Sequence, residues 1–127
     1  MTGDRMRRVD EAMREVLSGV ITSEIKDPRV GFVTVTAVET SADLRHARVF
    51  VSVLGDDAVR KRSLAGLESA RGYMQKRVAS ELRMKNTPTL HFQYDDSIDR
   101  SIRISELVER LGEADGEPPG RDRKETP

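Results

Sequence analysis

The sequence predicts one two-layer α+β domain, in which helices cover one face of a three-stranded sheet. Apolar residues recur every three or four positions in long stretches, which is typical of amphipathic helices. In shorter stretches they alternate with polar residues, which indicates strands with one buried face. The order is helix, strand, strand, helix, helix, strand, helix. Because the last strand follows a long helical crossover, it can lie parallel to a neighbour, and a length of 127 residues fits one domain.

The first half of the chain is predicted to form a long helix followed by a β-hairpin. The helix covers about residues 4–26 and ends before Pro28, because the residue preceding a proline disfavours the helical conformation. β-Branched residues over 32–38 indicate the first strand. After a turn at 41–43, valines alternate with other residues over 47–53, which predicts a second strand that pairs with the first.

The second half is predicted to contain a bent helical region, a strand and a short last helix. The helical region runs to about residue 84, and Gly72 interrupts it at a cost of about 1 kcal/mol relative to alanine. The third strand covers 90–94, and the last helix follows Ser97. From Gly112 on the chain has almost no apolar residue. We therefore expect a domain over 1–111 and a disordered tail over 112–127.

The net charge of zero hides an uneven distribution along the chain. Residues 55–94 carry eight Lys and Arg against four Asp and Glu, a net charge of +4, whereas residues 95–127 carry six against ten, a net charge of −4. Cations clustered around a bend favour contact with nucleic-acid phosphates. The candidate RNA-binding residues are Arg60, Lys61, Arg62, Arg71, Lys76, Arg77, Arg83 and Lys85. A possible secondary basic spot consists of Arg5, Arg7 and Arg8.

The sequence gives little support to an enzyme, a metal site or a cofactor site. Cysteine is absent, and no nucleophile–base pair, phosphate loop or metal-ligand spacing is present. The carboxylates of Asp95, Asp96 and Asp99 fit the start of a helix better than a magnesium site. His46 and His91 alone do not make a zinc site. The polar N-terminus and short apolar runs predict a cytoplasmic protein without a membrane partner.

Five stretches in a fixed order resemble the bacterial ribosome-binding factor A family. They are residues 8–11 (Arg-Val-Asp-Glu), 26–31 (Lys-Asp-Pro-Arg-Val-Gly), 44–53, 70–72 (Ala-Arg-Gly) and 87–99. The resemblance implies a type II KH-like fold with an Ala-X-Gly bend at Ala70 and Gly72. It also implies a non-catalytic assembly factor without a cofactor, linked to growth in the cold. Its expected partners are the free small (30S) ribosomal subunit and 16S rRNA, whose processing and maturation it assists; we expect it to act as a monomer and to leave whole ribosomes unbound.

The bend distinguishes this chain from ordinary KH domains, which clamp single-stranded nucleotides with a GXXG loop. No such loop is present, because Gly66 and Gly72 are too far apart. We therefore expect binding through side-chain charge and shape, with Arg71, Lys76 and Arg77 as the best candidates. Two alternatives stay open. A general single-stranded RNA-binding KH-type module would bind short oligonucleotides as well as it binds the subunit, and a protein-interaction module would tolerate charge reversal of those three residues.

Overall fold

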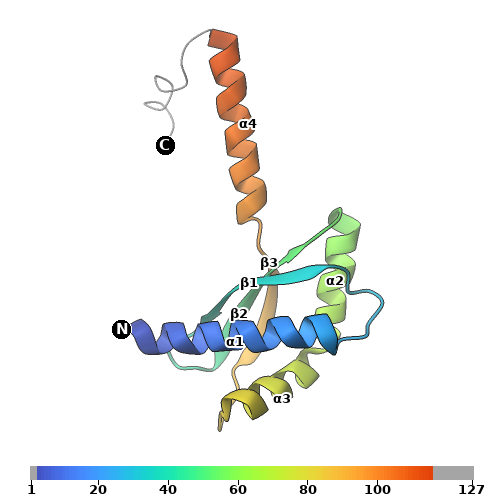
Figure 1. Ribbon diagram of the computed structural model, residues 1–127, viewed down its shortest axis with the longest axis vertical. Coiled ribbons are helices and arrows are strands. Elements are labelled where there is room, and N and C mark those ends of the chain that lie inside the picture. Colours follow the sequence, from blue (N-terminus) through green and yellow to red (C-terminus); the bar gives the residue numbers. More distant parts are fainter. Residues whose placement is uncertain (1–2, 116–127) are drawn as a thin grey trace. The chain divides into compact units, whose positions relative to one another are not determined.

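The computed structural model of the protein describes residues 3–115 (Figure 1). Its elements are α1 (Gly3–Ser23), β1 (Val33–Thr40), β2 (His46–Val53), α2 (Asp57–Ser69), α3 (Arg71–Leu82), β3 (Thr89–Tyr94) and α4 (Ser97–Asp115). The chain divides into two compact units, Met1–Asp95 and Asp96–Pro127. The first contains the sheet and three helices, and the second contains α4. The predicted α+β element order is confirmed.

The sheet has three strands in the order β1-β2-β3. β1 and β2 pair antiparallel as a hairpin, while β2 and β3 pair parallel, with Val49 opposite Phe92. Both predicted pairings are confirmed. The β1–β2 register shifts between Val35 and Ala37, and the hydroxyl of Thr36 at this bulge donates a hydrogen bond to Asp95 at 2.6 Å. The bulge lets β1 bury Val35 and Val38, three positions apart, on the same side.

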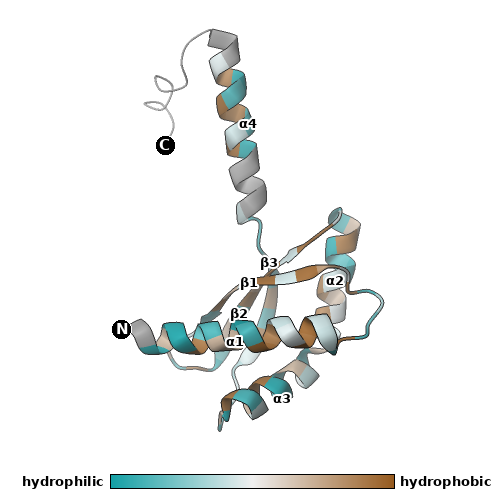
Figure 2. Ribbon diagram, in the orientation of Figure 1, coloured by the Kyte–Doolittle hydropathy of each residue, from teal (hydrophilic) through white to brown (hydrophobic). Residues whose placement is uncertain are grey.

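The core lies between the sheet and α1, α2 and α3. Alternate residues of β2 are buried, and hydrophobic residues are concentrated on the strands in Figure 2. A fully buried valine or leucine contributes about 1.5–3 kcal/mol through burial of apolar surface. The helices add buried side chains to the same cluster, namely Met13, Leu17, Val20, Ile21, Leu67, Met74 and Val78. The side chains of His46 and Arg48 are exposed on the opposite face of β2.

Element boundaries differ from the prediction at four places. α1 ends at Ser23 and not near residue 26, because the N–H of Ile25 donates to the carbonyl of Val20, five residues back, and so leaves the helical hydrogen-bond pattern. β1 covers Val33–Thr40, which leaves Phe32 outside the strand and 81% exposed. The helical region breaks at Ala70, two residues before the glycine.

The fourth difference concerns the last helix, which is longer than predicted. α4 has 19 residues and continues through Gly112 to Asp115. The disordered tail predicted over 112–127 lies, from residue 116 on, outside the described residues. None of the helices among the described residues is long and apolar enough to cross a membrane.

Candidate nucleic-acid interface

The bend between α2 and α3 is formed at Ala70. Its N–H group donates to the carbonyls of Gly66 and Leu67 at 3.2 and 3.0 Å, and its own carbonyl accepts from Met74 at 3.0 Å. Alanine has no side-chain acceptor, so no side chain caps the start of α3. The first N–H groups of a helix without such a cap carry partial positive charge toward solvent. The start of α3 therefore presents backbone donors to an anion.

Gly72 lies in the first turn of α3, and nothing within the described chain requires a glycine there. Gly55 is the glycine with a positive φ among the described residues, so Gly72 has no conformation that a side chain would strain. A Cβ atom added at Gly72 would meet nothing within 4 Å. The residue is also exposed. The missing side chain therefore leaves the backbone open to a partner from outside.

Gly66, in the last turns of α2, has the opposite environment. It is buried, and an added Cβ would lie 2.6 Å from Cγ2 of Val30. The loop over residues 26–31 packs directly on this part of α2. The loop is fixed there by Ser63, whose hydroxyl accepts from the N–H of Gly31 at 3.1 Å and donates to the carbonyl of Arg29 at 3.4 Å. Sequence reasoning gave neither Gly66 nor Ser63 a role.

A shallow hollow of about 390 Å³ lies beside the bend. Its acidic side chains are neutralised by neighbours within the chain. Arg29 donates hydrogen bonds to the carboxylate of Asp27, which lowers the pKa of Asp27 to about 2, and it also reaches the hydroxyl of Ser69 at 2.9 Å. The residues that line the hollow are Glu24, Ile25, Lys26, Asp27, Ser69, Ala70 and Tyr73.

Glu24 connects the end of α1 to α3. The hydroxyl of Tyr73 donates a hydrogen bond to Glu24, and Arg77 contacts the same carboxylate at 3.1 Å. These two hydrogen bonds lower the pKa of Glu24, and the bond to Glu24 raises the pKa of Tyr73. Arg77 also pairs with Glu81 at 3.2 Å. Arg77 therefore ties α3 to α1, a role that the charge pattern alone did not reveal.

The structure spreads the eight predicted cations along the helix pair and does not gather them in one cluster. Arg60, Lys61 and Arg62 lie near the start of α2, and Arg71 lies at the bend. Lys76 and Arg77 lie within α3, and Arg83 and Lys85 follow its end. Figure 1 shows α2 and α3 leaving the bend in different directions, so the first and last of these cations lie at opposite ends of the pair.

The cations differ in how much of their charge is already paired. Arg71 forms an ion pair with Glu68, and Arg60 pairs with Asp57 at 3.3 Å and lies 4.4 Å above the ring centroid of Tyr94. Five others are exposed and form no ion pair within the described residues; these are Lys61, Arg62, Lys76, Arg83 and Lys85. Lys76 is thus the unpaired cation nearest to the bend.

The secondary basic spot lies at the other end of α1. Arg5, Arg7 and Arg8 are exposed on its first turns. The carboxylate of Asp10, in the next turn, accepts hydrogen bonds from the N–H and hydroxyl of Thr40 at the end of β1. Because the far end of α1 contacts α3 through Glu24, this spot is not continuous with the bend.

The fold and the bend define the class of protein: a KH-like α+β domain with an Ala-X-Gly bend where other KH domains have a GXXG loop. A family model described as ribosome-binding factor A matches residues 5–108. The ribosome-binding factor A of Halothermothrix orenii is 46% identical over 113 residues, which cover 89% of this chain and 93% of that protein. The Geobacter metallireducens protein of the same name is 43% identical over 112 residues, 88% and 95% of the two chains. The chain belongs to the ribosome-binding factor A family.

Solved structures agree with this assignment. The crystal structure of ribosome-binding factor A from Thermus thermophilus matches with a TM-score of 0.63 at 25% identity, covering 69% of this chain and 92% of that one. The solution structure of a putative ribosome-binding factor A from Thermotoga maritima matches with a TM-score of 0.65 at 31% identity, covering 72% and 87%. Coordinates of the Thermus thermophilus protein fitted into a cryo-EM map of a 30S complex match with a TM-score of 0.58 at 25% identity, covering 68% and 91%.

Proposed function

We propose that this protein is a cytoplasmic assembly factor that binds the small (30S) ribosomal subunit and assists maturation of 16S rRNA without catalysing a reaction. Family membership over most of the chain supports this function, as does the 30S complex of the Thermus thermophilus relative. Within the described residues, no group of three or more metal-ligating side chains is present. The protein would act by binding and stabilising one conformation of the RNA.

The observation that carries the proposal is the open bend. Gly72 leaves the backbone accessible, the start of α3 has no side-chain cap, and Lys76 lies one turn further along the helix. RNA phosphates are attracted both by cationic side chains and by the N–H groups at a helix start. A folded RNA surface can meet these groups together, whereas a four-nucleotide clamp would need a second glycine that the bend lacks.

The proposal is tested by sedimentation of the purified protein with 30S subunits over a range of salt concentrations. We expect co-sedimentation with free 30S subunits and not with whole ribosomes. The logarithm of the binding constant should fall with the logarithm of salt concentration, by about 0.7 to 0.9 for each phosphate neutralised. Absence of binding to 30S subunits would contradict the proposal.

A double variant and its control test whether α2 and α3 form the surface that binds 30S subunits. Lys61→Glu with Lys76→Glu reverses two exposed, unpaired cations and should weaken binding at least tenfold. The matched control, Arg103→Glu with Arg110→Glu, makes the same charge change on exposed residues of α4. If binding is insensitive to salt and to the first pair, a protein-interaction module is favoured. If short unstructured RNAs bind as tightly as the subunit, a general single-strand binder is favoured.

A further inference from the structure

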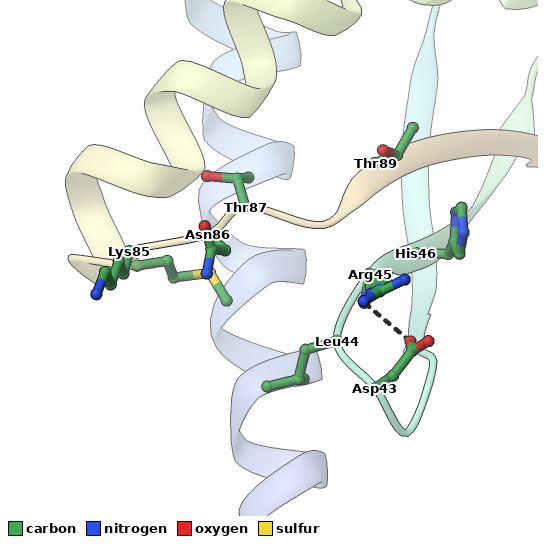
Figure 3. A pocket seen from close by; sticks show the side chains of 9 residues that line it. Asp43, Leu44, Arg45, His46, Lys85, Asn86, Thr87 and Thr89 are labelled. Carbon is green, nitrogen blue, oxygen red and sulfur yellow. Dashed lines mark hydrogen bonds between the residues drawn. The ribbon is translucent and has the colours of Figure 1, made fainter.

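A larger groove, of about 810 Å³, lies between the tip of the β1–β2 hairpin and the connection from α3 to β3 (Figure 3). This volume falls within the usual range for ligand sites, about 300–1,000 Å³. The hairpin wall consists of Asp43, Leu44, Arg45 and His46, and the opposite wall of Met84, Lys85, Asn86, Thr87 and Thr89. In Figure 3, α1 runs behind the opening and Leu44 extends from the hairpin into the space between the walls.

A backbone hydrogen bond joins the two walls, and side-chain hydrogen bonds hold the hairpin wall in shape. The N–H of Thr89 donates to the carbonyl of Arg45 at 2.8 Å, which joins the walls at their base. Within the hairpin, the carboxylate of Asp43 accepts from the hydroxyl of Ser41 at 2.6 Å and from the N–H of Arg45 at 3.0 Å. The same hydroxyl of Ser41 accepts from the N–H of His46 at 3.1 Å. The groove is therefore formed before any ligand enters.

The hairpin wall contains a left-handed residue, and a second one caps the end of α3 just before the other wall. Leu44 has a φ of 61° and Arg83, which ends α3 just before the second wall, has a φ of 53°. These two residues are the non-glycine positions with positive φ among the described residues. Left-handed backbone at bulky residues persists where surrounding structure holds it, and such positions cluster at ligand sites. At Leu44 the conformation places an apolar side chain, 39% exposed, at the opening of the groove.

The groove is lined by cationic, hydrogen-bonding and apolar side chains that one ligand could contact together. Within the described chain, the side chains of Arg45, Lys85 and Asn86 make no hydrogen bond or ion pair with one another or with a neighbour. Both hairpin hydrogen bonds of Asp43 are accepted by Oδ1, and its carboxylate also attracts Arg45 electrostatically. The groove thus presents two cations, a free amide and the hydroxyls of Thr87 and Thr89, together with the apolar side chains of Leu44 and Met84.

We propose that this groove binds one unpaired nucleotide of the RNA partner, an inference that rests on the proposed function. The phosphate is held by Arg45 on the hairpin wall, and Lys85 adds positive charge from the opposite wall. The base lies against Leu44 and Met84, and the amide of Asn86 provides both a donor and an acceptor for the edge of the base. A base in a duplex cannot enter, because its edge is paired and its faces are stacked; bulges and loops present bases that can.

The proposal is tested with two fluorescent RNA hairpins that share one stem, one fully paired and one with a single unpaired nucleotide. Fluorescence anisotropy of the full chain should show at least fivefold tighter binding to the bulged hairpin. This preference should be lost in Asn86→Ala, which removes the amide, and in Leu44→Gly, which removes the apolar side chain. Because glycine adopts positive φ without strain, Leu44→Gly should keep or raise the melting temperature. The matched control Ser80→Ala, at an exposed polar residue of α3 outside the groove, should keep the preference.

Sedimentation of the same proteins with 30S subunits separates this inference from the proposed function. If the wild-type protein binds 30S subunits but does not prefer the bulged hairpin, or if both variants keep the preference, the groove proposal is wrong and the function stands. If the variants lose 30S binding while the hairpin preference is unchanged, the groove contacts a ribosomal protein and the nucleotide assignment is overturned. If the wild-type protein does not bind 30S subunits at all, both proposals fall.

Discussion

Gly66 and Gly72 lie on either side of one bend, yet their surroundings are opposite. A Cβ at Gly66 would lie 2.6 Å from Val30, whereas a Cβ at Gly72 would meet nothing within 4 Å. The first glycine is required by packing inside the protein. The second is required neither by packing nor by backbone conformation within the described residues. The comparison shows that the packed loop on α2 supports the fold, and it is consistent with our proposal that the bend faces the RNA partner.

The largest expected effect is on stability, from Gly66→Ala. The added methyl group overlaps Val30, and overpacking of this kind costs about 1–3 kcal/mol. Alanine has a better helix propensity than glycine, which offsets part of the overpacking cost. We therefore expect a net loss of about 1–2 kcal/mol in the free energy of unfolding. Urea denaturation measures it. A stability equal to or above that of the wild type would show that the loop and α2 are not closely packed.

The next effect is expected from Ser63→Ala, which removes the hydroxyl that holds Gly31 and Arg29 to α2. Ser63 is fully buried, and the lost hydrogen bonds should lower the free energy of unfolding by about 1 kcal/mol. Hydrogen exchange should also become faster at the N–H of Gly31. Exchange at that N–H as slow as in the wild type would argue against the hydroxyl as its acceptor.

Gly72→Ala should change stability in the opposite direction. With an ordinary helical conformation and open space at this position, alanine should raise the free energy of unfolding by about 0.5–1 kcal/mol. The same denaturation experiment compares it directly with Gly66→Ala. Destabilisation by both substitutions would remove the distinction between the two glycines.

The smallest expected effect is a pH dependence of the stability that Asp27 contributes through the loop over residues 26–31. Hydrogen bonds from Arg29 lower the pKa of Asp27 to about 2 in the folded protein, from an ordinary value of 3.8. The ionised form therefore stabilises the fold above pH about 4, and this contribution is lost as pH falls toward 2. Chemical denaturation at several pH values should show wild type more stable than Asp27→Asn at pH 6, with the difference shrinking below pH 4. A difference that stays constant over this range would exclude Asp27 as its source.

The sequence predicted the fold well because the signals for it are local. Alternation along β2 and helical spacing around Met74 and Val78 depend on neighbouring residues, and these patterns gave the correct element order and pairings. The contact that Glu24, just after the end of α1, makes with Tyr73 and Arg77 was missed, because it joins distant parts of the chain.

The candidate site was predictable only in part, because its contacts depend on side-chain geometry and on residues that are distant in sequence. The bend and the surrounding cations are visible in the sequence, but the pairing of Arg71 with Glu68 and of Arg77 with Glu24 depends on side-chain geometry. The role of Gly66 depends on a loop that is remote in sequence. The left-handed Leu44 has no sequence signal, since leucine is not a residue that favours this conformation.

The central claim is that the bend is open because the RNA surface of the 30S subunit approaches it closely. The most direct measurement is the affinity of Gly72→Leu for purified 30S subunits, together with its melting temperature. Leucine is a good helix former, the position is exposed, and its Cβ would meet nothing within 4 Å, so the fold should be retained. We predict a melting temperature equal to or above that of the wild type and at least tenfold weaker binding. Affinity equal to that of the wild type would contradict the account.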